Sequence, residues 1–265
     1  MLLNIKILIK KYFFNIYKLY WLGGGQYLKF ASASDIGLVR AENQDKVHVS
    51  EINGNILAVL CDGMGGENSG REASEIAVNT VVDTFHSLYE PEADIKRLLF
   101  LSLFAANAAV YEEAADNPEK SGMGTTCVAA FVTDKLIHIV NVGDSRAYIY
   151  DNKEIKKITD DHTAVNMLVS NGKITAEEAK FHPYRNMLMK AVGVEPSVSP
   201  DYFRLEVPES FRLLLCSDGL SGFCSSEEIE NVLQNNSFEC LSDEFIRLAI
   251  SKGGRDNVTV AVIAE

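Results

Sequence analysis

The sequence lacks a Cys-x-x-Cys pair, an internal repeat and an excess of positive charge. Its 265 residues contain 25 Lys and Arg against 37 Asp and Glu, which gives a formal net charge of −12. Proteins bind nucleic acids largely by neutralising phosphates with Lys and Arg, so this balance argues against a nucleic-acid partner. With 47% hydrophobic residues, the chain is long enough to bury one substantial core.

The cysteines are odd in number and lie mostly in apolar segments. They are Cys61, Cys127, Cys216, Cys224 and Cys240. We interpret them as reduced thiols of a cytoplasmic protein. None is followed by Arg after five intervening residues, so a loop that would present a nucleophilic thiol in that form is absent.

The first 30 residues differ from the rest of the chain, because they carry five lysines and no acid. The lysines interrupt every apolar run, so no run reaches the roughly 20 residues of a membrane-spanning helix. A signal peptide also fits poorly, since no small-residue cleavage pattern follows. An amphipathic membrane-surface anchor and an extension of little consequence both stay open. The run Gly23-Gly24-Gly25 predicts that residues 1–26 lie outside a domain formed by residues 27–265.

Hydrophobic periodicity predicts strands grouped with strands and helices grouped with helices. This grouping indicates an α+β fold with helices outside the sheets, and not a doubly wound parallel fold. The strands are expected at residues 27–34, 46–49, 56–61, 125–132, 135–142, 146–150, 154–158, 202–207, 211–216 and 257–263. The helices are expected at residues 69–89, 93–115, 225–233 and 242–251. A polar, helix-prone stretch up to residue 184 interrupts the strands and is a candidate insertion.

Four aspartates stand next to apolar strands, each beside a glycine or a turn: Asp62, Asp144, Asp218 and Asp256. A carboxylate at a strand end is held by a rigid scaffold, and adjacent glycines let carbonyl oxygens and water approach. Hard cations such as Mg²⁺ and Mn²⁺ prefer oxygen ligands of this kind. A single Asp-Gly is usually only a turn, but four in the same setting indicate a metal site.

These runs, in this order, resemble the motifs of the type 2C (PPM) metal-dependent protein serine/threonine phosphatases, over nearly all of residues 27–265. Met64 and the compact length resemble the bacterial members. The matching motifs are Arg40-Ala-Glu-Asn-Gln-Asp45, Asp62-Gly-Met-Gly-Gly66, Gly124-Thr-Thr126, Gly143-Asp-Ser-Arg146, Asp161-His162, Ser217-Asp-Gly-Leu220 and Gly254-Arg-Asp-Asn257.

The resemblance implies a sandwich of two antiparallel sheets flanked by helices on both sides, and a set of metal residues. That set comprises Asp45, Asp62, Gly63, Asp144, Asp218 and Asp256. Asp62 would bridge two Mn²⁺ or Mg²⁺ ions, with Asp218 and Asp256 completing the first site and the Gly63 carbonyl binding the second. Asp45 would hold metal-bound waters. Asp144, with Asp218, would bind a weaker third ion.

The implied reaction is hydrolysis of phosphoserine and phosphothreonine by a water or hydroxide that bridges the two ions. Arg40 would clasp the substrate phosphate with its planar guanidinium, which makes Arg40, Asp45, Asp62 and Asp218 the candidate catalytic residues. Phosphorylated proteins are the expected substrates, and the enzyme would reverse a serine/threonine kinase as a monomer. A metallohydrolase for small phosphoesters is a rival within enzymes.

Departures from the family pattern leave a second alternative. Gln44 stands where many relatives have Glu, and Gly222 replaces an acid found in some of them. Met64 replaces a histidine of eukaryotic members, so a metal-bound water or His162 would have to protonate the leaving group. A catalytically weak pseudophosphatase that acts as a regulatory binding module therefore stays open.

The polar insertion at about residues 166–184 corresponds to the flap of bacterial members. We expect it beside the substrate groove. Its alternative interpretation is a solvated helical pair with no catalytic role.

Overall fold

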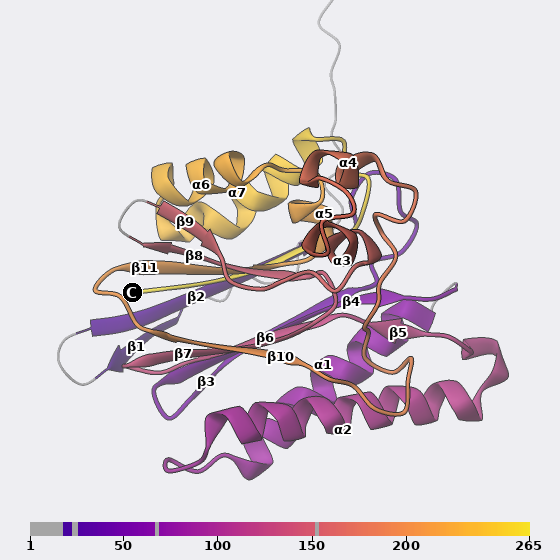
Figure 1. Cartoon of the computed structure of the whole chain (residues 1–265). Helices are drawn as coiled ribbons and strands as arrows, with labels where there is room; N and C mark the ends of the chain where they lie inside the picture. The colour runs from indigo at the N-terminus through magenta and orange to yellow at the C-terminus, as the bar shows by residue number, and fades with distance from the viewer. Residues whose placement is uncertain (1–17, 23–25, 67–68, 152–153) are drawn as a thin grey trace, which may run out of the picture.

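The structure is a computed structural model that describes residues 18–22, 26–66, 69–151 and 154–265. Two antiparallel sheets pack face to face (Figure 1). The first has the strand order β1(Lys18–Leu22), β2(Gln26–Asp35), β12(Val258–Ala264), β11(Phe211–Cys216), β8(Arg146–Asp151), β9(Glu154–Lys157). The second runs β10(Asp201–Glu206), β7(Leu136–Val142), β6(Cys127–Val132), β4(Asn55–Met64), β3(Asp45–Ile52), and the short β5(Gly124–Thr125) pairs with β4.

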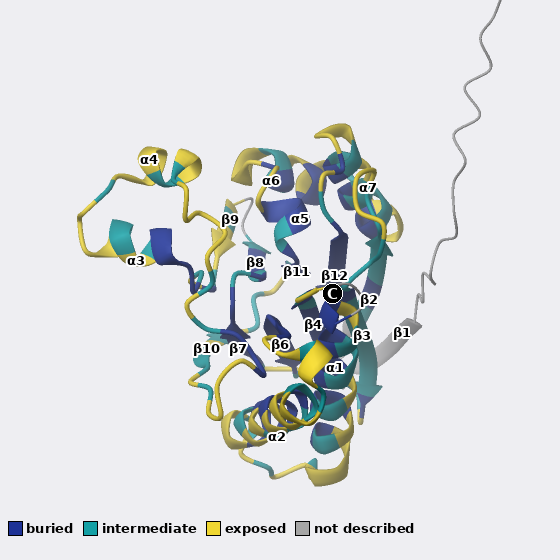
Figure 2. Ribbon diagram, turned by 90° about the vertical axis from the view of Figure 1, so that its right-hand side faces the viewer, coloured by how far each residue is buried: buried dark blue, intermediate teal, exposed yellow. Residues whose placement is uncertain are grey.

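Helices cover the outer face of each sheet, and this confirms the predicted fold class. The helices α1(Ser69–Leu88) and α2(Ile95–Asp116) lie against the second sheet, and a 3-10 turn, η1(Pro118–Lys120), follows them. The helices α5(Asp218–Ser221), α6(Ser226–Asn235) and α7(Phe238–Ser251) lie against the first sheet. Two further helices, α3(Ala164–Ser170) and α4(Ala176–Phe181), form the predicted insertion and project from the sandwich (Figure 2).

β4 shows why its sequence suits the centre of such a sandwich. Leu57 and Val59 pack toward α1 and α2, whereas Ile56 and Leu60 pack into the core between the sheets. Side chains alternate between the two faces of a strand, so both faces must be apolar where both are covered. The apolar run ends at Asp62, which marks the point where the strand leaves the core.

The predicted boundary at residue 26 is wrong in one respect. Lys18–Leu22 forms β1, which pairs with β2 in antiparallel register, so this part of the lysine-rich segment extends the first sheet. The glycine run that indicated a boundary instead separates two paired strands. The anchor hypothesis concerns residues 1–26, of which residues 1–17 and 23–25 lie outside the described residues.

α2 is long and apolar enough, by length and composition alone, to cross a membrane. Its composition has a simpler explanation in this fold. Leu98, Leu99, Leu103, Ala106 and Val110 are buried in the core beneath it. The apolar run therefore packs against α1 and the second sheet.

Candidate active site and metal centre

The candidate residues from five separate segments meet at one end of the sandwich. They surround a pocket of about 360 Å³ lined by Arg40, Gln44, Asp62, Gly63, Met64, Gly65, Thr126, Asp144, Asn186, Leu188, Asp218, Asp256 and Asn257. Asp45 is buried next to the pocket, and its backbone pairs with that of Asp62 across β3 and β4. The structure therefore brings together all six residues of the implied metal set and Arg40.

Asp62 is fixed by hydrogen bonds to its backbone from both neighbouring threonines. The Thr126 hydroxyl accepts from the Asp62 N–H at 2.9 Å, and the Thr126 N–H donates to the Asp62 carbonyl at 2.8 Å. The Thr125 hydroxyl donates to the same carbonyl at 2.9 Å. Both threonines are buried, so these bonds hold the carboxylate at a constant place at the end of β4.

Gly63 permits a close approach between β4 and the beginning of α1. A Cβ atom at Gly63 would lie 1.9 Å from the carbonyl oxygen of Gly70, so no other residue fits here. The Gly63 N–H donates to the Gln44 carbonyl at 3.2 Å, and the Ser74 hydroxyl donates to the same carbonyl at 2.6 Å. The backbone that carries Gln44 is thus bound to the strand that carries Asp62 and Gly63.

Asp45 belongs to a buried network of hydroxyl groups between the two sheets. The Ser217 hydroxyl donates to Asp45 Oδ2 at 2.7 Å and accepts from the Thr259 N–H at 3.0 Å. Thr259 Oγ1 lies 2.7 Å from the hydroxyl of Ser34, which in turn accepts from Asn43. Asp45 Oδ1 is buried and has no hydrogen-bond partner, so it is an oxygen free to hold a cation or its water.

Burial and mutual repulsion make the carboxylates at the pocket hard to ionise together. Burial raises the pKa of Asp45 and of Asp144 to about 7, and the charge of Asp218 adds to both shifts. Burial also raises the pKa of Asp62 and of Asp218, and neighbouring carboxylates add to each shift. The charge of Asp218 is among the causes that raise the pKa of Asp62, so the two carboxylates resist ionising together. The cluster is therefore short of positive charge.

These residues fit hard divalent cations by their chemistry. The donors are carboxylate and carbonyl oxygens, the repulsion between them is the kind that a divalent ion relieves, and one buried oxygen lacks a partner. Among the described residues, no three His, Cys, Asp or Glu side chains surround a single point as ligands. One of the candidate carboxylates, Asp256, is instead ion-paired with Arg40 at 2.8 Å.

Asn257 holds the loop that carries Arg40, a role that sequence reasoning did not identify. Its side chain accepts from the Gln44 N–H at 2.8 Å and donates to the carbonyls of Ile36 and Glu42 at 3.0 and 2.8 Å. The loop is also fixed by a hydrogen bond of 2.7 Å from the Leu38 N–H to the Gly254 carbonyl. Both ends of the loop are therefore attached to the segment that contains Asp256.

Arg146 helps to fix the position of α5, the helix that begins at Asp218. Its guanidinium makes three hydrogen bonds to Asp161, the shortest at 2.6 Å, and donates once to the Ser221 carbonyl at the end of α5 at 3.1 Å. Because α5 begins at Asp218, this contact fixes the short helix on β8. The sequence pattern indicated that Arg146 belongs to a motif but not what it binds.

His162 is taken up by structural contacts and does not line the pocket. Its Nδ1 accepts from the Gly143 N–H at 3.1 Å, and its Nε2 lies 3.1 Å from Asp201 Oδ2. The ring is buried at the base of the insertion. These contacts favour the interpretation of His162 as a structural partner over that of a proton donor to substrate.

Gly222 follows α5 and cannot be replaced simply by an acid. A Cβ atom there would lie 2.7 Å from the carbonyl oxygen of Asp218. Asp144 and Asp218 line the pocket as carboxylates, whereas position 222 adds none.

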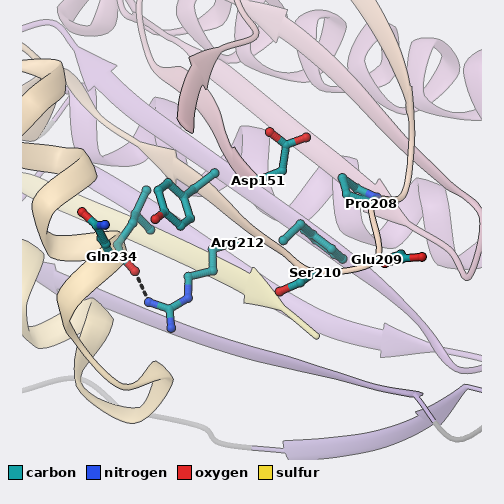
Figure 3. A pocket seen from close by; sticks show the side chains of 9 residues that line it. Asp151, Pro208, Glu209, Ser210, Arg212 and Gln234 are labelled. Atoms are coloured by element: carbon teal, nitrogen blue, oxygen red, sulfur yellow. Dashed lines mark hydrogen bonds between the residues drawn. The ribbon is translucent and has the colours of Figure 1, made fainter. Parts of the chain in front are cut away.

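A larger pocket of about 570 Å³ lies at the opposite end of β8 and β11 and contains none of the candidate residues (Figure 3). Asp151, Pro208, Glu209, Ser210, Arg212 and Gln234 are among its lining residues. Arg212 donates to the carbonyls of Leu233 and Asn236, so its guanidinium serves to fix the end of α6. Size alone does not identify the functional pocket.

The raised carboxylate pKa values predict how metal and pH act on stability. In a chelator, the folded protein keeps protons on Asp45 and Asp144 up to about pH 7, whereas the unfolded chain loses them near pH 4. The contribution of these groups to the free energy of unfolding therefore falls as pH rises from about 4 to 7. Because Mn²⁺ competes with those protons, we expect it to raise the melting temperature more at pH 8 than at pH 5.

Thermal unfolding with and without Mn²⁺ at the two pH values measures this effect. Asp144→Asn should weaken the pH dependence, whereas Asp134→Asn, at an exposed turn, should leave it unchanged. An equal Mn²⁺ effect at pH 5 and pH 8 would show that protons and metal do not share these carboxylates.

Known proteins share both this sequence and this fold. The family described as Protein phosphatase 2C matches residues 39–253. The serine/threonine phosphatase stp of Listeria welshimeri is 37% identical over 235 residues, which cover 87% of this chain and 93% of that protein.

Two solved structures agree with these matches. The crystal structure of the Mycobacterium tuberculosis serine/threonine phosphatase PstP/Ppp superimposes with a TM-score of 0.82 at 38% identity, covering 89% of this chain and 97% of that one. A structure of the PstP catalytic domain in complex with two manganese ions gives a TM-score of 0.80 at 36% identity, over 89% and 97% of the two chains. The chain therefore belongs to the protein phosphatase 2C family and is a metal-dependent protein-serine/threonine phosphatase.

Proposed function

We propose that this phosphatase hydrolyses phosphoserine and phosphothreonine in proteins with two divalent cations held by Asp62, Gly63, Asp218 and Asp256. The observation that carries the proposal is the convergence of these residues, from three separate segments, on one pocket with Arg40 at its edge. The relative with two manganese ions supports a two-metal site of this kind.

Each residue has a role that follows from its place. Bound divalent ions supply an acidic water and neutralise charge on the phosphoryl oxygens. Asp45, buried and bonded to Ser217, would orient metal-bound water through its free Oδ1. Arg40 is half exposed and bonded to Asp256, so its guanidinium can turn from that carboxylate to a substrate phosphate.

The identity and number of the ions form the finer part of the proposal. Mn²⁺ and Mg²⁺ both accept an all-oxygen ligand set, so either would serve. A third, weaker ion would use Asp144 and Asp218. The pseudophosphatase alternative finds no support, because the relatives are phosphatases and the carboxylates of the family motifs meet at the pocket.

A phosphothreonine peptide and p-nitrophenyl phosphate, compared with Mn²⁺ and with a chelator, test the proposed reaction. We expect kcat/KM for the peptide to exceed that for the small ester, and the chelator to abolish both activities. A preference for the small ester would instead favour a hydrolase of small phosphoesters.

The insertion that contains α3 and α4 is expected to act as the substrate flap. The segment that follows α4 contributes Asn186 and Leu188 to the pocket lining. At the base of the insertion, the Ala164 N–H donates to the Met187 carbonyl at 2.8 Å, and the Met189 N–H donates to the His162 carbonyl at 2.7 Å. α4 is largely exposed, whereas α3 is partly buried (Figure 2). They can therefore contact a protein substrate that extends beyond the pocket.

Replacing residues 167–184 with a short Gly-Ser linker should raise KM for phosphopeptides more than KM for p-nitrophenyl phosphate. The small ester fits within the pocket and has no group to reach α4. Steady-state kinetics on both substrates measures the difference. Equal losses on the two substrates would count against a substrate role and for a role in holding the site together.

We further propose that the enzyme reverses a serine/threonine kinase in the cytoplasm as a monomer. The five cysteines support the compartment, since all are unpaired and four are buried. We also propose that residues 1–26, which combine lysines with apolar residues and contain no acid, bind a membrane surface.

A further inference from the structure

Two of the most exposed large apolar residues in the described part of the chain stand directly before Arg40. Leu38 and Val39 are each 68% exposed, and among the large hydrophobic residues that the structure describes only Phe181 on the flap exceeds them. A single exposed apolar residue is unremarkable, but an adjacent pair at the edge of a site indicates a contact surface.

The loop that carries this exposed pair is held in place by hydrogen bonds on both sides of the pair. The Leu38 N–H is bonded to the Gly254 carbonyl, and Asn257 binds both Ile36 and Glu42 on either side of the pair. At Gly37, φ is +79°, and a Cβ atom would lie 2.3 Å from the Asp256 carbonyl oxygen. The loop therefore lies close against the segment of Asp256, with the Leu38 side chain beside Gly254, while Leu38 and Val39 each remain 68% exposed.

The pair lies next to the pocket, because Val39 directly precedes Arg40. Arg40 lines the pocket, as do Asn186 and Leu188 from the segment that follows α4. α5, which begins at Asp218, lies between the flap helices and α7 (Figure 2), and the loop is bonded to Gly254 just after α7. A polypeptide whose phosphate reaches Arg40 would therefore pass Val39 at its next residues, since successive Cα atoms are only about 3.8 Å apart.

We propose that Leu38 and Val39 form a docking surface for an apolar side chain of the substrate, within about two residues of the phosphorylated serine or threonine. The proposal rests on the proposed function and adds a substrate class to it: phosphoproteins whose modified residue has an apolar neighbour. The occupant is a substrate segment because the surface is continuous with Arg40, which lines the pocket and is the residue proposed to bind the substrate phosphate. A rigid, preformed surface binds without first having to order itself.

Two phosphothreonine peptides test this surface, identical except for Leu or Ser at the two positions on each side of the phosphothreonine. We expect the wild-type enzyme with Mn²⁺ to prefer the Leu peptide by about five- to tenfold in kcat/KM, an effect typical of one apolar contact. Val39→Ser and Leu38→Ser should each reduce that preference to about twofold or less. Leu88→Ser is the matched control, because Leu88 is also exposed but ends α1, far along that helix from Gly63.

The outcomes separate this inference from the proposed function. If the wild-type enzyme hydrolyses both peptides equally, or if neither loop variant alters its preference, the docking surface is wrong while the phosphatase assignment stands. If no phosphopeptide is hydrolysed at all, the proposed function is wrong, and the docking surface is then wrong as well. A Val39→Ser variant with altered gel-filtration volume and unaltered peptide preference would assign the loop to a contact between two copies and overturn the proposal.

Discussion

Asp218→Asn should lower phosphatase activity by at least about 100-fold at saturating Mn²⁺ while leaving the fold intact. The amide keeps the size and hydrogen-bonding ability of the carboxylate but loses the negative charge that a cation needs. Asp218 is partly buried at the start of α5, where burial and the charge of Asp256 raise its pKa. Removing one of several crowded carboxylates should also relieve repulsion, so we expect the variant to melt at a higher temperature in a chelator.

Three measurements make this prediction specific: steady-state kinetics, calorimetric titration with Mn²⁺, and thermal unfolding in a chelator. The variant should bind Mn²⁺ more weakly. Asp134→Asn removes the same charge from an exposed turn and should change none of these quantities. Near-normal activity of Asp218→Asn would remove Asp218 from the metal site.

Arg146→Ala should lower the free energy of unfolding by about 3 kcal/mol or more. The substitution leaves the largely buried Asp161 side chain without its main partner and removes the hydrogen bond from Arg146 to the Ser221 carbonyl of α5. Burial alone would raise the pKa of Asp161, but the hydrogen bonds and charge of Arg146 lower it below its ordinary value. In a domain of this size we expect the melting temperature to fall by at least about 6 °C.

Arg247→Ala provides the control for Arg146→Ala. Arg247 pairs with Glu244 on the exposed side of α7, and such surface pairs contribute about 0–1 kcal/mol. The double variant Arg146→Ala, Asp161→Asn should recover part of the loss, because the stranded charge is gone. If Arg146→Ala were no more harmful than Arg247→Ala, the buried pair would not be what anchors α5.

The parts of the fold that could be predicted depend on local pattern. The buried strands were found because their sequences are apolar on both faces and end at turns, as β4 ends at Asp62. The start of α7 was placed four residues late, at Ser242 instead of Phe238, since a phenylalanine in a helical first turn gives no distinct signal. β1 was missed because its pairing partner is needed to distinguish it from an extension, and the intervening glycines resemble a linker.

The candidate site could be predicted only as a set of motifs. The sequence indicated which aspartates carry the chemistry, and the structure brings them to one pocket; their individual roles stay predictions. The supporting residues could not be predicted, because their partners are distant in the chain. Ser217 binds Asp45 across 172 positions, and Asn257 binds Gln44 across 213. Hydrophobic periodicity gives no signal for hydrogen bonds between residues so far apart in the sequence.

The place of β12 in the first sheet has a consequence for biosynthesis. β12 lies between β2 and β11, so the sheet closes only when this strand enters its centre. A chain emerging from the ribosome exposes β2 and β11 long before β12, and Asp256 and Asn257 arrive with β12. A nascent chain therefore cannot assemble the complete pocket until β12 has been synthesised and has entered the sheet.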